Sequence, residues 1–213
     1  MRFSNGLVKP PPYSYNGKDA IATSRIMVGG SKRRHNLDRI LVLDGYSTPK
    51  IATTKLMENV ELAPRIWEPA NGYGAISLPL KERNHKVFTS DVYRWHKSTM
   101  EVQDFFDYKK APAKHDIITN PPFKLAFEFA QHGIKIIDSG YKIGLLVRLQ
   151  FLESIRRKKF FQNHPPRCYV FSKRLPFLAR FDDKKPIHSS AMAFAWFVWT
   201  KDEELRNGEI YWL

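Results

Sequence analysis

The tetrapeptide Asn120-Pro121-Pro122-Phe123 has the residue types in this sequence that best fit a chemical role. Two consecutive prolines fix the backbone and remove two amide donors, so nearby carbonyls can face a ligand without competing N–H groups. Pro121 also restrains Asn120 towards an extended conformation. The segment therefore predicts a rigid platform: Asn120 and a carbonyl accept the two hydrogens of an amino group, while Phe123 stacks on the planar base that bears it.

Accepting both hydrogens of an aromatic amine has a chemical purpose. The lone pair of such an amine is delocalised into the ring, and the two hydrogen bonds favour a pyramidal nitrogen whose lone pair faces an electrophile. Fixing the nitrogen in line with that electrophile supplies further rate through proximity. This chemistry needs no metal. The alternative interpretation is structural, because Pro121-Pro122 would also end a strand and start the helix that follows.

A second candidate site is the segment from Glu68 to Gly74, with the sequence Glu-Pro-Ala-Asn-Gly-Tyr-Gly, between a predicted strand and a predicted helix. Ligands of open α/β sheets bind at such strand ends. Gly72 and Gly74 let the backbone turn tightly and pass close to a ligand. Position 77 is serine, so the third glycine of a dinucleotide-binding loop is missing. A nucleotide bound here would not be held mainly by its phosphates, although an ordinary tight turn has a similar composition.

Asp91 ends the next predicted strand, where a carboxylate can accept both ribose hydroxyls of a nucleoside. Taken alone, Asp91 fits a solvated turn residue or a helix cap equally well. Its position after the glycine-rich segment favours the nucleoside-binding role.

Strands and helices are predicted to alternate along the chain. Apolar runs predict strands at 65–67, at 86–89 with its end at Asp91, and at 116–119, 142–149, 167–171 and 191–199. Helices are predicted after Pro49, through Leu80 with a bend at Pro79, and at 126–137 and 152–161. This alternation predicts an α/β fold with a mostly parallel sheet and helices on both faces. The run at 191–199 is typical of a strand buried on both faces.

The first 40 residues differ from the rest of the chain. They lack periodicity and contain Pro10-Pro11-Pro12 and the basic run Lys32-Arg33-Arg34. We predict a loosely ordered arm over 1–40, which either touches phosphates or is a plain flexible terminus, and one folded domain over 41–213. The start of the sequence has no apolar run of the kind that predicts a signal peptide. The longest apolar stretch is too short to cross a bilayer. The single cysteine, Cys168, excludes an internal disulfide and a cysteine-cluster metal site, which fits a reducing cytoplasm.

The charge balance favours a polyanionic partner. The 213 residues include 35 Lys and Arg against 21 Asp and Glu, which gives a formal charge of +14. Each phosphate that a cation neutralises releases counterions, so such an excess favours nucleic-acid binding. A basic protein that is kept soluble by its charge would have the same composition.

With both candidate sites in view, the chain resembles the class I, S-adenosylmethionine-dependent DNA N6-adenine methyltransferases, including the small ones of phages and mobile elements. The resemblance covers roughly residues 44–199. The segment from Glu68 to Gly74 is similar to the family's cofactor loop, Asp91 to its ribose-binding acid, and Asn120-Pro121-Pro122-Phe123 to its catalytic motif. Tyr46-Ser47-Thr48-Pro49 resembles the element that contacts the methionine moiety, and Asp104-Phe105-Phe106 the element that contacts the cofactor's adenine.

The resemblance implies a Rossmann-like class I methyltransferase fold, a catalytic domain over 41–213, and S-adenosylmethionine as the cofactor. It implies methyl transfer to N6 of adenine in DNA. The implied location is the cytoplasm of a bacterium or a phage-infected cell, and restriction-modification is one implied biological role. No metal and no membrane association are expected. The implied catalytic residues are Asn120, Pro121, Pro122 and Phe123. The implied cofactor-binding residues are Thr48, Pro49, Glu68, Pro69, Ala70, Gly72, Gly74, Asp91, Asp104 and Phe105.

Two basic stretches are the predicted nucleic-acid contacts. They comprise Arg156, Arg157, Lys158 and Lys159 on a predicted helix, and Lys173, Arg174, Phe177 and Arg180 further on. Cations that track phosphates together with an aromatic wedge suit a base-flipping enzyme, although a solvated helix face can have the same charge run. Little chain follows the catalytic motif, whereas family members that read a defined sequence usually carry a recognition insertion or a second domain. We therefore expect short or relaxed sequence specificity.

Two further hypotheses remain. The Asn-Pro-Pro-aromatic signature also serves methyltransferases of RNA adenine or guanine and of protein glutamine; the charge argues against a protein substrate but does not separate DNA from RNA. A catalytically inactive fold that only binds nucleic acid is the other hypothesis. The intact tetrapeptide argues against it, because a pure binding module needs no asparagine beside two prolines.

Overall fold

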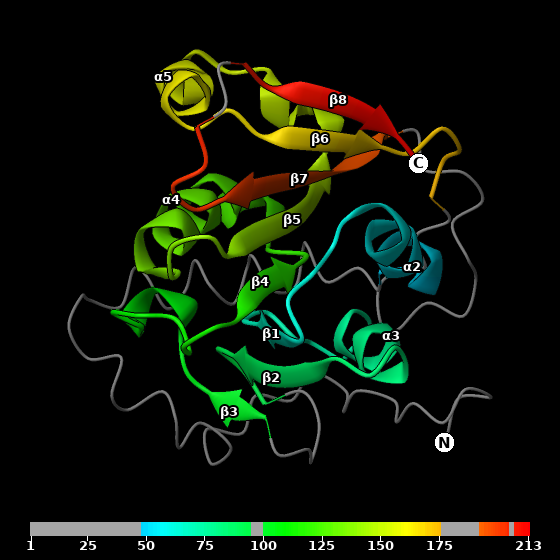
Figure 1. Ribbon diagram of the computed structural model, residues 1–213, viewed down its shortest axis with the longest axis vertical. Helices are drawn as coiled ribbons and strands as arrows, with labels where there is room; N and C mark the ends of the chain where they lie inside the picture. Colours follow the sequence, from blue (N-terminus) through cyan, green and yellow to red (C-terminus); the bar gives the residue numbers. More distant parts are fainter. Residues whose placement is uncertain (1–47, 95–99, 176–191, 205–206) are drawn as a thin grey trace, which may run out of the picture.

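The computed structural model describes residues 48–94, 100–175, 192–204 and 207–213 (Figure 1). The predicted arm over 1–40 lies outside these residues, as do Tyr46, Phe177 and Arg180. The strands are β1 (Arg65–Glu68), β2 (Lys86–Asp91), β3 (Glu101–Val102), β4 (Asp116–Thr119), β5 (Lys142–Arg148), β6 (Arg167–Val170), β7 (Phe194–Thr200) and β8 (Glu209–Trp212). The helices are α2 (Lys50–Asn59), α3 (Ser77–Glu82), α4 (Ala126–Ile136) and α5 (Ile155–Asn163), with 3₁₀ turns η2 (Phe105–Asp107), η3 (Phe123–Leu125) and η4 (Leu149–Leu152).

The strands of the described ranges form one sheet in the order β3-β2-β1-β4-β5-β7-β6-β8. The pairs from β3 to β5 are all parallel, and β6 pairs in parallel with β8. Strand β7 lies between β5 and β6 and runs antiparallel to both. The prediction of an α/β fold with a mostly parallel sheet is therefore confirmed.

Helices cover both faces of the sheet (Figure 1). On one face, α2 and α3 pack on Ile66, Ile118, Leu146 and Trp196. On the other face, α4 packs on the alternate residues of the same strands, which are Trp67, Ile117, Leu145 and Phe197. Successive strand residues point to opposite faces, so a central strand with helices on both sides must be apolar throughout. The prediction of a strand buried on both faces is confirmed for Phe194 to Trp199 of β7, whereas residues 192 and 193 are half-buried and precede the strand, and residue 191 lies outside the described residues.

Two local predictions were wrong, and two short strands were not predicted. Helix α3 begins at Ser77, so Pro79 lies in its first turn, where a missing N–H costs little, and no bend is needed. The basic helix begins at Ile155 rather than at 152, because residues 149–152 form the 3₁₀ turn η4. Strands β3 and β8 were not predicted. Strand β3 has only two residues, too few to show periodicity, and the burial of β8 residues at the sheet edge alternates only weakly.

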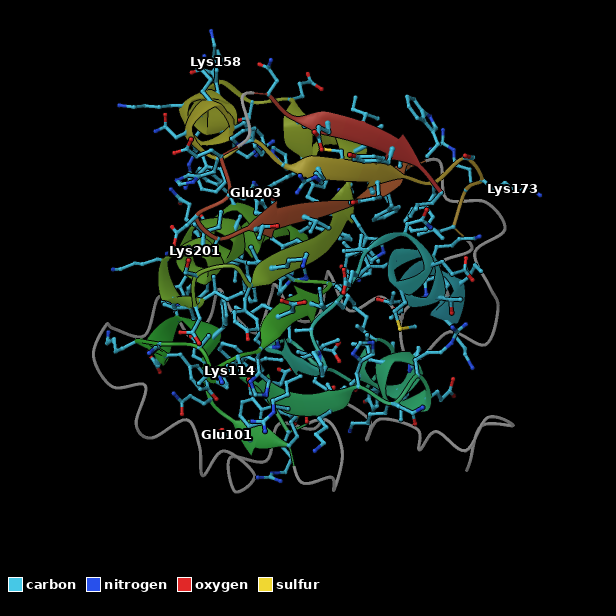
Figure 2. All side chains as sticks on the ribbon, viewed as in Figure 1. Glu101, Lys114, Lys158, Lys173, Lys201 and Glu203 are labelled. Atoms are coloured by element: carbon cyan, nitrogen blue, oxygen red, sulfur yellow. The ribbon has the colours of Figure 1, made fainter. Side chains whose placement is uncertain are left out.

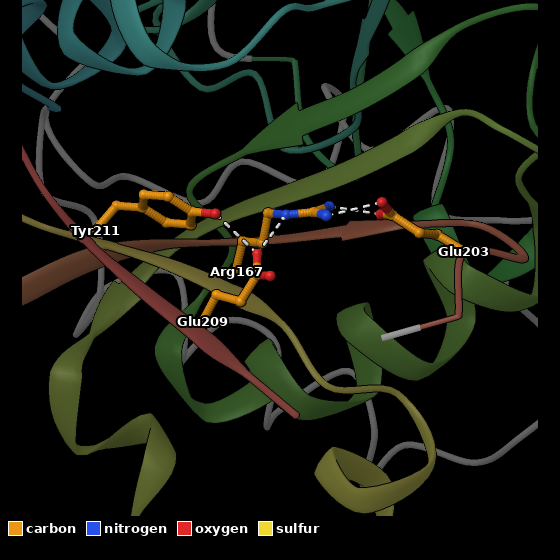
Figure 3. A network of polar contacts seen from close by, with 4 residues as sticks. All are labelled: Arg167, Glu203, Glu209 and Tyr211. Carbon is orange, nitrogen blue, oxygen red and sulfur yellow. Dashed lines mark hydrogen bonds and ion pairs between the residues drawn. The ribbon is translucent and has the colours of Figure 1, made fainter. Parts of the chain in front are cut away.

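A charged cluster attaches β8 and the segment after β7 to β6. Arg167 donates from Nε to Glu209 Oε2 (2.8 Å) and from Nη2 to Glu203 Oε1 (2.7 Å) (Figure 3). The hydroxyl of Tyr211 donates to the same oxygen of Glu209 at 2.8 Å. Hydrogen bonds from Arg167 hold the pKa of Glu203 below its ordinary value.

We expect Arg167→Met to lower the free energy of unfolding at pH 7 by about 1 kcal/mol, the upper end for partly exposed ion pairs. The pKa of Glu203 is lower in the folded than in the unfolded protein. The pairing therefore stabilises the fold above the ordinary pKa of 4.5, and this stabilisation is lost as the pH falls through the folded-state pKa. Urea unfolding at pH 7 and pH 3 measures the effect.

The difference between wild type and Arg167→Met should shrink at pH 3. Arg65→Met is the matched control, because Arg65 is an exposed arginine at the start of β1. A difference that is the same at both pH values would show that the ion pairs do not stabilise β8.

Candidate active site

Glu68, Asp91 and Asn120 lie at the carboxyl ends of three neighbouring strands. Glu68 is the last residue of β1, Asp91 is the last of β2, and Asn120 directly follows β4. Strand β1 pairs in parallel with β2 on one side and with β4 on the other, so the three ends share one edge of the sheet. The strand order reverses at β1, and open α/β sheets bind their ligands at such a switch point. The candidate residues thus converge where this architecture places ligand sites.

The glycine-rich segment between β1 and α3 forms a tight, internally bonded turn. Gly72 and Gly74 have φ angles of +50° and +82°, which side chains of other residues rarely adopt. Asn71 holds the turn, since its carbonyl accepts the N–H of Gly74 at 2.8 Å and its Oδ1 accepts the hydroxyl of Ser77 at 2.6 Å. Sequence analysis did not assign Asn71 and Ser77, because their spacing belongs to no motif.

Asp91 is oriented by two backbone amides. Its carboxylate is 5% exposed and accepts the N–H of Gly72 at 2.8 Å on Oδ2 and the N–H of Tyr93 at 3.1 Å on Oδ1. The N–H of Asn71 donates to the carbonyl of Ser90 at 3.2 Å, which ties the glycine turn to β2 a second time. The turn and the carboxylate are therefore one preorganised unit.

Glu68 is a buried carboxyl at the end of β1. It is 2% exposed, and its Oε2 has no hydrogen-bond partner in the described part of the chain. Burial raises the pKa of Glu68 well above its ordinary value, and the negative charge of Asp91 raises it further, while Ser77 opposes the shift. A buried acceptor without a donor costs stability, so this oxygen suits a donor group supplied by a ligand.

Asn120 is held with one side-chain atom bound and the other available. Its Nδ2 donates to Oγ1 of Thr48 at 3.0 Å, across 72 positions of the chain. Its Oδ1 is buried and has no hydrogen-bond partner among the described residues. The structure therefore brings Thr48 and Pro49, two predicted cofactor contacts, next to the predicted catalytic amide.

Phe123 lies half-buried in η3, just before α4. Its ring centroid is 5.7 Å from that of Phe194, and the Cζ of Arg148 lies over its face at 4.5 Å. Sequence analysis did not identify Arg148 or Phe194 as site residues. Arg148 had a usable signal, because it is a charged residue directly after the apolar run 143–147 at a predicted strand end.

Asp104 and Phe105 lie beside the same sheet edge. The N–H of Gln103 donates to the carbonyl of Asp91 at 3.0 Å, which places the start of η2 next to the end of β2. Asp104 caps η2 by accepting the N–H of Phe106 at 3.0 Å. The ring of Phe105 is 2% exposed and stacks on Phe129 at 4.5 Å in the core. The predicted contacts of Asp104 and Phe105 with a cofactor remain predictions.

Two of the predicted nucleic-acid contacts, Arg156 and Arg157, form bonds within the protein. Arg157 donates to the carbonyls of Phe151 (2.7 Å) and Glu153 (3.0 Å), and Arg156 pairs with Glu128 at 2.8 Å. Lys158, Lys159, Lys173 and Arg174 are exposed. Lys158 and Lys173 project on opposite sides of the end of the molecule that contains β6 and β8 (Figure 2). The exposed cations thus do not form one compact patch.

Two findings concern other classes of site. Within the described ranges, no helix is long and apolar enough to span a membrane. The same residues contain no group of three or more His, Cys, Asp or Glu side chains that could hold a metal ion.

Solved structures resemble this chain in fold. No protein-family model and no curated protein sequence matches it. A protein of Pyrococcus horikoshii, assigned provisionally as an RNA methyltransferase, is 14% identical, with a TM-score of 0.54 over 76% of this chain and 88% of that one. A protein of Listeria monocytogenes, assigned provisionally as a class I S-adenosylmethionine-dependent methyltransferase, is also 14% identical, with a TM-score of 0.52 over 85% and 72%. The chain therefore has the Rossmann-like fold of class I methyltransferases, as predicted.

Proposed function

We propose that this protein is an S-adenosylmethionine-dependent methyltransferase that methylates the exocyclic N6 amine of adenine in DNA. The observation that carries the proposal is the state of Asn120. Thr48 binds its Nδ2 and thereby directs Oδ1 as an acceptor, and that buried oxygen has no partner in the described structure. An amino hydrogen of a substrate would satisfy it.

The residues at the sheet edge fit the proposed cofactor. The positive φ angles of Gly72 and Gly74 let the backbone pass close to a nucleoside, and Asp91 is oriented to receive ribose hydroxyls. The Oε2 of Glu68, which has no hydrogen-bond partner among the described residues, suits the ammonium of the methionine moiety, and Thr48 and Pro49 lie beside Asn120. When bound, S-adenosylmethionine supplies an electrophilic methyl group on a sulfonium.

The chain's own contribution to the reaction is to hold the acceptor nitrogen. Asn120 Oδ1 accepts one hydrogen of the target amine, and a carbonyl of the Pro121-Pro122 segment, which has no competing N–H, accepts the other. Phe123 stacks on the base. These contacts favour a pyramidal nitrogen and fix its direction, so the rate gain comes from orientation and from hydrogen bonds that strengthen in the transition state.

The charge of +14 supports a nucleic-acid substrate. DNA is favoured by the resemblance of the Asn120-Pro121-Pro122-Phe123 motif and its companion segments to DNA adenine methyltransferases. RNA is the second candidate, because the Pyrococcus horikoshii protein of the same fold is assigned provisionally as an RNA methyltransferase. The proposed base-holding chemistry is the same for both polymers.

Incubation of the protein with labelled S-adenosylmethionine and either DNA or RNA tests the proposal. Mass spectrometry of the nucleosides should find N6-methyldeoxyadenosine in the DNA reaction. Label only in RNA adenosine or guanosine would replace DNA by RNA as the substrate. Label in neither polymer would contradict the proposed function.

The same enzyme should show a short or relaxed sequence context. The exposed cations Lys158, Lys159 and Lys173 suit phosphates rather than base edges, so DNA affinity should fall steeply with salt. Long-read mapping of methylated adenines in DNA from an expressing cell measures the context. Modification confined to one motif of about four or more defined bases would reveal a recognition surface, since each position read needs its own base contact.

A further inference from the structure

Arg148 projects from the same face of the sheet as the catalytic amide. Leu146 of β5 and Ile118 of β4 belong to one core cluster, so they point to one face. Arg148 and Asn120 each lie two residues further along their strands, and residues two apart point the same way in an extended chain. Strands β4 and β5 are parallel neighbours. Because Ile118 pairs with Gly144, the position level with Asn120 is Leu146, and Arg148 lies two residues beyond it on the same face at the carboxyl edge.

The Arg148 guanidinium lies over the ring of Phe123 and makes no ion pair with any described residue. Its Cζ lies 4.5 Å from the centroid of Phe123, the ring proposed to stack on the target base. Its Nε is buried and has no hydrogen-bond partner in the part of the chain that the structure describes. A buried charged donor that lacks an acceptor is costly. The described structure therefore leaves a buried donor that an acceptor on a ligand would satisfy.

We propose that Arg148 is a substrate-positioning residue that donates from Nε to a ring nitrogen of the target base beside its amino group; this inference rests on the proposed function. Adenine has such an acceptor nitrogen on each side of the amine, at N1 and N7. With Asn120 Oδ1 accepting from the amine and Arg148 Nε donating to the ring, the two side chains match a donor and an acceptor on one base edge.

A base edge fits Arg148 better than a phosphate does. The Nε is buried and the Cζ lies over Phe123, whereas the phosphates of a bound strand remain at the surface, where Lys158 and Lys173 are exposed. A planar guanidinium can stack on a ring and donate in its own plane, which a lysine ammonium cannot. The position thus uses properties that are specific to arginine.

The test compares wild type, Arg148→Met and Arg148→Lys on oligonucleotides with a single adenine, 1-deazaadenine or 7-deazaadenine. Arg148→Met should lower kcat/KM for adenine roughly ten- to a hundred-fold, as expected for a hydrogen bond to a charged group. One of the two analogues should lower kcat/KM of the wild type by a similar factor. Arg148→Met should lose little more on that analogue, because contacting groups are non-additive. Arg148→Lys should retain part of the activity, since it keeps the charge.

Oligonucleotide affinity over a salt series gives a readout independent of turnover. A base contact leaves the salt slope of Arg148→Met unchanged, whereas a lost phosphate contact would lower the slope by roughly 0.7–0.9 and overturn the proposal. Arg65→Met, on an exposed arginine at the opposite edge of the sheet, should behave as wild type on all three oligonucleotides. If the loss caused by Arg148→Met and the loss caused by each analogue add up in an active, folded enzyme, the proposed role of Arg148 is contradicted. The proposed function would still stand. Absence of methylation by the wild type overturns the proposed function as well.

Discussion

Replacement of Asn120 by alanine is expected to lower kcat by roughly a hundred- to a thousand-fold, the usual cost of removing a preorganised polar group that acts on the transition state. The Oδ1 of Asn120 is directed into the site by the bond from its Nδ2 to Thr48. Its hydrogen bond to the amine strengthens as the nitrogen becomes pyramidal, so its loss should affect turnover much more than binding. Single-turnover kinetics with labelled cofactor measure the effect.

Calorimetry should find unchanged affinity of Asn120→Ala for S-adenosylmethionine. The matched control is Asn59→Ala, because Asn59 is an exposed asparagine at the end of α2 whose side chain donates to the carbonyl of Lys55, outside the candidate site. Thr48→Val keeps the amide but removes the group that orients it, so its kcat should fall less than that of Asn120→Ala. A folded Asn120→Ala protein with normal turnover would contradict the proposed chemistry.

Asp91→Ala is expected to weaken S-adenosylmethionine binding by about 1.5–3 kcal/mol, the range for hydrogen bonds to a charged group. The carboxylate lies at the end of β2, where the amides of Gly72 and Tyr93 hold it in place. Its removal deletes the proposed ribose acceptor and also releases the glycine turn. Isothermal titration calorimetry measures the loss directly.

Thermal unfolding of Asp91→Ala should accompany the titration, because the lost backbone contacts also affect stability. Asp91→Asn keeps one acceptor oxygen and should bind with intermediate affinity. Glu61→Ala, an exposed acid before β1, is the control for a general effect of charge. Equal affinities of wild type and a folded Asp91→Ala protein would remove Asp91 from the cofactor site.

The local features of the candidate site were predictable from the sequence. The strand at 116–119 has the bounds of β4, because an apolar run stopped by two prolines leaves no other boundary. The glycine turn and the position of Asp91 at the end of β2 were also predicted. These features depend on backbone preferences and apolar patterns within a few residues.

Side-chain burial and pairing were not predictable in the same way. Phe105 is predicted to contact the cofactor, and only the structure shows that its ring also packs in the core against Phe129. Arg157 is predicted to contact nucleic acid, and only the structure shows that its guanidinium also donates to the carbonyls of Phe151 and Gln150 and lies over the ring of Phe151. These contacts were not predictable because Phe129 is distant from Phe105 in sequence and because the turn η4, which Arg157 contacts, was not predicted.

The sequence by itself determined the alternation of elements, the α/β class and the chemistry available to Asn120-Pro121-Pro122-Phe123. Only the tertiary structure decided which groups meet. It placed Thr48 on the amide of Asn120, put Arg148 over Phe123, and inserted β7 antiparallel between β5 and β6. Local conformation follows from backbone sterics and short-range hydrogen bonds, whereas these contacts depend on how the two faces of the sheet pack against their helices.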